Sequence, residues 1–184
     1  SLSLYLMSEY ANIPLDDKSI FWFFISCSIL IFIADKYELA VLNFFISLRH
    51  DRLTDVVLVI NFLGDIKFVL PASAILLIWF WLSKRIFHLL LLFFSVATSA
   101  GLVFLLKDFF MRFLPGIELQ LVSENSFSFP SGHAMMAIAF WGVLAYLLSK
   151  NFSEQWQKTV VIAGGCALIF AISISRLYLG VHWP

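Results

Sequence analysis

The stretch that decides the fold is IFHLLLLFFSVATSAGLVFLL, residues 86–106, which contains no Asp, Glu, Lys or Arg. A helix of about 20 mostly apolar residues matches the thickness of the hydrocarbon core of a bilayer. Basic side chains flank the stretch, with Lys84 and Arg85 before it and Lys107 after it. The pattern therefore predicts a helix that crosses a membrane.

The rest of the chain has the same character. Its 184 residues are 61% hydrophobic and 13% charged, whereas a soluble domain is about half apolar and about a quarter charged. We expect an all-α, polytopic transmembrane helix bundle of five spans that forms a single membrane-embedded domain over residues 1–184. The expected spans are Ile20–Ala34, Lys67–Leu82 with a kink at Pro71, Ile86–Leu106, His133–Ser149 and Thr159–Ile174.

Residues 37–65, between the first two expected spans, are different. Their apolar runs are too short to cross a bilayer and alternate with charged side chains such as Glu38, Arg52 and Asp55. This pattern predicts two amphipathic helices that lie at the membrane interface or fold against the bundle. Gly64-Asp65 predicts a break before the second span.

Composition also argues against several classes of function. The formal net charge is zero, which gives no electrostatic support for nucleic-acid binding. Cys27 and Cys166 lie inside apolar runs, where small buried hydrophobic residues are more common than disulfides or metal ligands. No His and Cys cluster has zinc spacing, and no acidic pair suggests magnesium. We therefore expect no cofactor and no metal.

Three short polar motifs stand at the ends of the expected spans. Lys107 ends the third span, PSGH (130–133) opens the fourth, and Ser175-Arg176 with His182 follows the fifth. Because successive spans cross in opposite directions, all three motifs fall on one side of the membrane. Two imidazoles, two cations, a hydroxyl and a glycine can hold a phosphoryl group and transfer it through histidine.

In this order and spacing, the motifs resemble those of the phosphatidic acid phosphatase type 2 superfamily, which includes bacterial membrane lipid phosphatases and the vanadium haloperoxidases. The family pattern is Lys, six residues, Arg-Pro; then Pro-Ser-Gly-His; then Ser-Arg, five residues, His, three residues, Asp. The resemblance covers residues 67–184. It implies a metal-independent membrane phosphatase that acts on lipid phosphates or diphosphates at the bilayer surface.

The resemblance assigns a role to each matching residue. His182 matches the nucleophile, which forms a phosphohistidine, and His133 matches the group that protonates the leaving oxygen and then activates water. Backbone N–H groups at the start of the fourth span point toward an anion. The residues expected to bind the phosphate are Lys107, Arg112, Ser131, Gly132 and Arg176.

The chain departs from the family pattern in two places. The first is Leu114-Pro115, where the family has Arg-Pro. On a continuous helix Arg112 would point about 140° away from Lys107, so Arg112 joins the site only if the helix loosens before Pro115. The second is the family Asp that orients the nucleophile, which would fall beyond Pro184. We expect the chain to be truncated there, with the Asp and a sixth span in the parent protein.

Other functions and the orientation stay open at this point. A lipid phosphotransferase would use the same phosphohistidine, and decayed motifs would leave a non-catalytic membrane protein; a haloperoxidase has no use for so apolar a chain. The motifs do not rank undecaprenyl diphosphate, phosphatidylglycerophosphate, phosphatidate or lipid A phosphate as substrates. The short basic turn at Lys84 and Arg85 favours a bacterial inner-membrane protein with its site facing the periplasm. We expect His50 and His88 to be solvated polar groups.

Overall fold

The computed structural model describes residues 37–124 and 126–184, and the regular elements in these ranges are all helices. The chain separates into two compact units, residues 1–40 and residues 41–184, and the labelled helices belong to the second. The expected span Ile20–Ala34 and Cys27 lie outside the described residues. A single domain over the whole chain therefore stays a prediction.

Residues 37–65, before the second expected span, form two helices. They are Tyr37–Ser47 and α3, Asp51–Phe62. Helix α3 ends in a turn at Gly64, and the carboxylate of Asp65 then accepts a hydrogen bond from the backbone N–H of Lys67 at 2.9 Å, which caps the next helix. The predicted break is thus present, while a position of these helices at the membrane interface stays a prediction.

The remaining helices follow the expected spans closely. Helix α4 is Ile66–Leu82, α5 is Ile86–Phe110 and α8 is Gln155–Tyr178. Between α5 and α8, α6 (Gly132–Ala137), one turn of π-helix η2 (Ile138–Gly142) and α7 (Val143–Ser149) form one continuous helix. Among the described residues, α5, this continuous helix and α8 are long and apolar enough to cross a membrane, and α4 is apolar but has 17 residues. The structure confirms the all-α transmembrane fold, and the number of spans stays a prediction.

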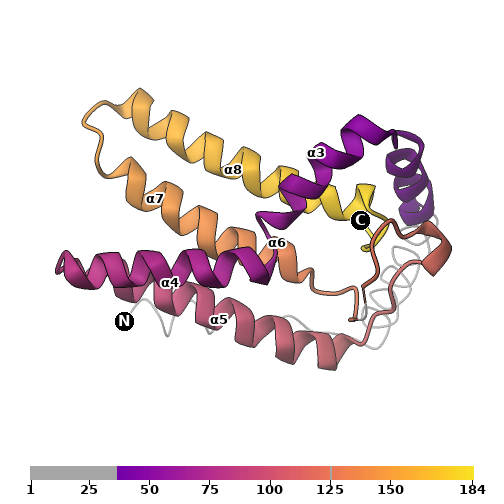
Figure 1. Ribbon diagram of the computed structural model, residues 1–184, viewed down its shortest axis with the longest axis horizontal. Helices are drawn as coiled ribbons and strands as arrows, with labels where there is room; N and C mark the ends of the chain where they lie inside the picture. The colour runs from indigo at the N-terminus through magenta and orange to yellow at the C-terminus, as the bar shows by residue number, and fades with distance from the viewer. Residues whose placement is uncertain (1–36, 125) are drawn as a thin grey trace, which may run out of the picture. The chain divides into compact units, whose positions relative to one another are not determined.

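The helices of the second unit pack side by side (Figure 1): α4 lies on α5, α7 lies on α8, α6 contacts both α5 and α8, and α3 packs on α8. One apolar core lies between α4, α5 and the continuous helix. Its buried residues are Val69, Phe80, Leu92, Val96, Met136, Ala139, Phe140 and Leu147. A smaller cluster joins α3 to the segment that follows α8, through Val57, Tyr178, Leu179 and Val181.

Large apolar side chains cover the outer faces of the helices. Phe104 on α5 is 68% exposed and Phe170 on α8 is 66% exposed. A surface of this kind suits lipid contact. Cys166 is also exposed on α8, so the expectation that it is buried is wrong. The reason is that the apolar outer face of a spanning helix is covered by lipid rather than by protein.

Candidate active site

The end of α5, the start of α6 and the end of α8 lie at the same end of the bundle (Figure 1) and enclose a cavity of about 400 Å³. The turn before α4 and the segment between α5 and α6 complete its wall. Five predicted site residues line this cavity: Lys107, Gly132, His133, Arg176 and His182. Three motifs that are far apart in the sequence are therefore brought together.

Lys107 sits in the last turn of α5. That helix ends at Phe110 because Met111 adopts a left-handed conformation, with φ of 43°. The ammonium group of Lys107 donates a hydrogen bond of 2.6 Å to the hydroxyl of Ser126. A serine on the following segment thus fixes the direction of this cation.

His133 is held at the start of α6. The Ser131 hydroxyl caps the helix by accepting a hydrogen bond from the N–H of Ala134 at 3.4 Å. The Nε2 atom of His133 is buried without a hydrogen-bond partner and lies 3.7 Å from Oδ2 of Asp65. A buried ring nitrogen without a partner usually marks a place where a ligand or a water binds.

His182 is placed by a turn that only glycine accommodates. Gly180 has a φ of 72°, and a Cβ there would lie 2.1 Å from the carbonyl oxygen of Leu119. Arg49 stabilises the same turn, because it donates hydrogen bonds to the carbonyl oxygens of Tyr178 (2.9 Å) and Leu119 (2.8 Å). The turn brings His182 back against the end of α8, where the residue is 4% exposed.

The environment keeps the ring of His182 neutral. Burial, reinforced by the positive charge of Arg176, lowers the pKa of His182 to about 3. Its Nδ1 atom lies 3.3 Å from the hydroxyl of Ser128. In the tautomer that donates from Nδ1 to this hydroxyl, Nε2 carries a lone pair that faces no proton near neutral pH.

Arg176 is 3% exposed and is held from two sides. One terminal nitrogen donates to the amide oxygen of Asn61 on α3 at 3.1 Å, and the other donates to Glu124 at 2.6 Å. Its Nε atom is buried without a partner. Burial raises the pKa of Glu124, but the hydrogen bond and charge of Arg176 outweigh it and lower the pKa overall, so Glu124 is a carboxylate.

Arg112 and Ser131 line a neighbouring cavity of about 360 Å³ instead. Arg176 and His182 also contribute to its wall. Because α5 ends at Phe110, Arg112 does not follow helical geometry and the predicted angle of about 140° from Lys107 does not apply. The structure thus places Arg112 and Ser131 beside the His182 and Arg176 pair but outside the first cavity.

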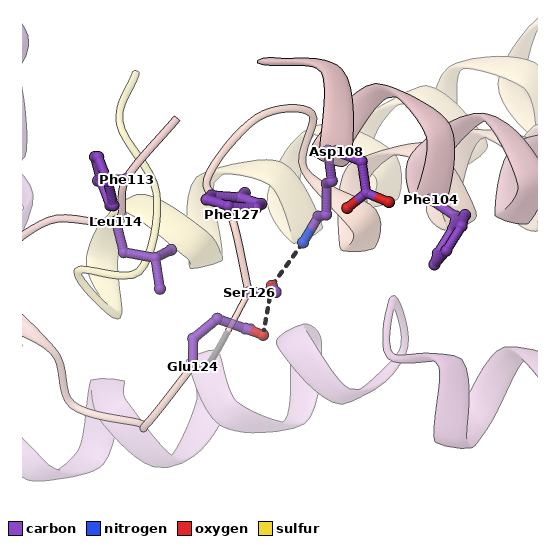
Figure 2. A pocket seen from close by; sticks show the side chains of 8 residues that line it. Phe104, Asp108, Phe113, Leu114, Glu124, Ser126 and Phe127 are labelled. Atoms are coloured by element: carbon purple, nitrogen blue, oxygen red, sulfur yellow. Dashed lines mark hydrogen bonds between the residues drawn. The ribbon is translucent and has the colours of Figure 1, made fainter. Parts of the chain in front are cut away.

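Leu114 lines a third cavity, of about 610 Å³, which shares Lys107 and Glu124 with the first (Figure 2). Its other walls include three aromatic rings, those of Phe104, Phe113 and Phe127. The leucine that replaces the expected arginine therefore contributes an apolar surface to a cavity that also contains Lys107.

Sequence reasoning missed four polar residues of this region: Asn61, Glu124, Ser126 and Ser128. Three of them belong to the polar run 123–128, which lies between the end of an apolar helix and PSGH. A polar segment that joins two motifs on one side of the membrane is a usable signal. Asp65, which follows the predicted break, caps α4 and also faces His133.

The arrangement suits a tetrahedral anion. The guanidinium of Arg176 and the ammonium groups of Lys67 and Lys107 line one cavity with two imidazoles. Nε of Arg176 and Nε2 of His133 are buried without a hydrogen-bond partner, so each is available to a bound ligand. Within the ranges that the structure describes, no group of three or more His, Cys, Asp or Glu side chains is placed to hold a metal ion.

Comparison with known proteins agrees with this geometry. A family model of the PAP2 superfamily matches residues 88–184. Phosphatidylglycerophosphatase B of Bacillus subtilis (strain 168) is 35% identical over 140 residues, which is 75% of this chain and 68% of that protein. Phosphatidylglycerophosphatase B of Escherichia coli (strain K12) is 40% identical over 63 residues, 33% of this chain and 22% of that protein.

Two solved structures are similar as well. A transmembrane PAP2 type phosphatidylglycerolphosphate phosphatase from Bacillus subtilis has a TM-score of 0.76 at 31% identity, over 90% of this chain and 83% of that one. LpxE of Aquifex aeolicus has a TM-score of 0.64 at 26% identity, over 80% of this chain and 84% of that one.

Proposed function

Because the chain belongs to the PAP2 superfamily, we propose that it is a membrane lipid phosphatase that works through a phosphohistidine on His182. The observation that carries the proposal is that His133 and His182 line one cavity together with Lys107 and Arg176. The relatives named as phosphatidylglycerophosphatases support a lipid substrate.

The first step transfers the phosphoryl group to the protein. The free lone pair of His182 forms a bond to phosphorus, and the bond from phosphorus to the ester oxygen breaks. Protonated His133 gives its proton to the leaving oxygen. The carboxylate of Asp65, 3.7 Å from Nε2 of His133, favours the protonated form of that ring. The dephosphorylated lipid then leaves.

The second step releases inorganic phosphate. Neutral His133 takes a proton from a water molecule as the water oxygen attacks phosphorus, and the bond to His182 breaks. In both steps Arg176 and Lys107 offset the negative charge on the non-bridging oxygens. Because cations and imidazoles supply the positive groups, we propose that the reaction needs no metal ion.

The cavity that contains Leu114 would bind the apolar part of the lipid substrate. Its aromatic and aliphatic walls begin at Lys107, so an apolar group attached to a phosphate bound there would be covered by Phe104, Phe113 and Phe127. Burial of apolar area is favourable at about 25 cal/mol per Å².

We assign the site to the periplasmic face of a bacterial inner membrane, because Lys84 and Arg85 form a basic turn at the other end of α5.

The proposal is tested by phosphate release from phosphatidate, phosphatidylglycerophosphate and a polyprenyl diphosphate in mixed micelles, using the full-length protein. We expect release that EDTA leaves unchanged and that His182→Ala abolishes. His88→Ala is the matched control, since His88 lies on α5 with its ring near Phe80, and it should keep activity. Phosphate release by His182→Ala at the rate of the unchanged protein would overturn the proposal. If the substrate phosphate is labelled and the label appears on an acceptor lipid, the protein is a phosphotransferase.

A further inference from the structure

Glu124 is an anionic side chain in the middle of a site that binds an anion. One carboxylate oxygen accepts a hydrogen bond of 2.6 Å from Arg176, and the other accepts one of 3.0 Å from the hydroxyl of Ser126. Ser126 in turn accepts from Lys107 at 2.6 Å, and Figure 2 shows Ser126 joined to Glu124 by a dashed line. Glu124 is thus linked directly to Arg176 and through Ser126 to Lys107, and it lines the first cavity and the apolar one.

A negatively charged side chain is not needed merely to hold Arg176 in place. Asn61, a neutral acceptor, already fixes one terminal nitrogen of the guanidinium at 3.1 Å. A carboxylate differs from an amide in carrying a negative charge. This charge offsets part of the positive charge that would otherwise attract a bound phosphate. The cavity is lined by three cations, Lys67, Lys107 and Arg176, and by two carboxylates, Asp65 and Glu124.

This balance matters most for the product. A phosphate monoester and inorganic phosphate both carry close to two negative charges at about pH 8, but the apolar cavity adds binding energy only for the lipid. Weaker binding of the phosphoryl group therefore removes a larger fraction of the binding free energy of inorganic phosphate than of the lipid substrate. Uniform tight binding of both would slow release without helping the chemical step.

We propose that Glu124 is a positioning and charge-balancing residue, which holds Arg176 and, through Ser126, Lys107 toward the phosphate while its own charge keeps inorganic phosphate weakly bound. This inference rests on the proposed phosphatase function. It assigns to Glu124 a contribution to product release rather than a contact with the reacting atoms.

The test compares Glu124→Gln with the unchanged protein. Glutamine keeps the length of the side chain and one oxygen acceptor but removes the charge. We expect inorganic phosphate, titrated at about pH 8, to bind roughly tenfold more tightly to Glu124→Gln, as loss of one charge at close range implies. Inhibition of lipid hydrolysis by phosphate should strengthen by the same factor, and turnover at saturating lipid should fall.

Two further variants keep the test decisive. Glu118→Gln is the matched control, because Glu118 is exposed on the same segment, in η1 (Ile117–Leu119), and should leave phosphate affinity unchanged. Glu124→Asp retains the charge and should keep phosphate binding weak even if shortening the side chain lowers turnover. Unchanged or weaker phosphate binding by Glu124→Gln would overturn the proposal, because replacing a residue with only a structural role would not increase the affinity for phosphate.

The phosphate titration is read without turnover, so the two proposals fail separately. Absence of lipid hydrolysis by the unchanged protein would reject the phosphatase function. Hydrolysis with no gain of phosphate affinity in Glu124→Gln would reject the role of Glu124 alone.

Discussion

At the scale of single residues, the proposed chemistry depends on the charge state of His182. Burial and the nearby Arg176 lower its pKa to about 3. Since a histidine is neutral above its pKa, we expect the ring of His182 to stay neutral as the pH falls from about 8 to about 5, across the range where an unperturbed histidine gains its proton.

The measurement is a pH titration of ¹⁵N-labelled histidine side chains by NMR, with His182→Gln used to assign the signal. The expected signal keeps the shifts of a neutral imidazole throughout. A midpoint between about pH 6 and about pH 7 would show that the ring is solvated, and that the packing around it differs from the one described above.

A second prediction at this scale concerns Leu114. This residue lines the apolar cavity beside Lys107 and does not line the cavity that contains the two histidines. Leu114→Ala should therefore lower kcat/KM for a long-chain lipid phosphate by up to roughly tenfold, the equivalent of part of one buried leucine side chain. Hydrolysis of a short, water-soluble phosphate monoester should change little. An equal loss on both substrates would place Leu114 at the phosphate instead.

At the scale of elements, the turn between α3 and α4 fixes how closely α6 and α8 approach. A Cβ on Gly64 would lie 2.4 Å from Cγ2 of Ile172 and 3.3 Å from the carbonyl oxygen of His133. Ile172 is fully buried, so it has no room to move. Gly64→Ala should push this turn away from His133 and lower both the melting temperature and kcat.

Gly101→Ala is the matched control, because nothing lies within 4 Å of a Cβ built there. Gly101 is inside α5, where alanine favours a helix by up to about 1 kcal/mol over glycine. Circular dichroism melts in detergent and initial rates measure both variants. Equal melting temperatures for Gly64→Ala and Gly101→Ala would show that the turn is not packed as described.

The helices were predictable because apolar length alone identifies them. The expected Ile86–Leu106 and Thr159–Ile174 lie within α5 and α8, and the observed helices are longer at their ends. Hydropathy does not mark an end such as Met111, where the chain turns through a left-handed residue. For the same reason, the helical geometry assumed for Arg112 does not hold.

At the scale of the whole molecule, the meeting of the three motifs followed from alternating crossings. The order of the spans is enough to expect Lys107, His133 and Arg176 at one end of the bundle, and all three line one cavity. It does not predict which side chains of an irregular segment turn inward. Glu124 and Ser126 have no periodic neighbours, and their roles depend on hydrogen bonds to residues distant in the sequence.

We propose that these distant segments form one phosphoryl-transfer site with His182 as its nucleophile. The most direct test is rapid quenching of the full-length protein with a lipid phosphate labelled with ³²P on its terminal phosphate, followed by alkaline digestion and mapping of the label. We expect acid-labile, alkali-stable label on His182 that is absent in His182→Ala and accumulates when His133→Ala slows its hydrolysis. Steady phosphate release with no protein-bound label, or label on a residue other than His182, would contradict it.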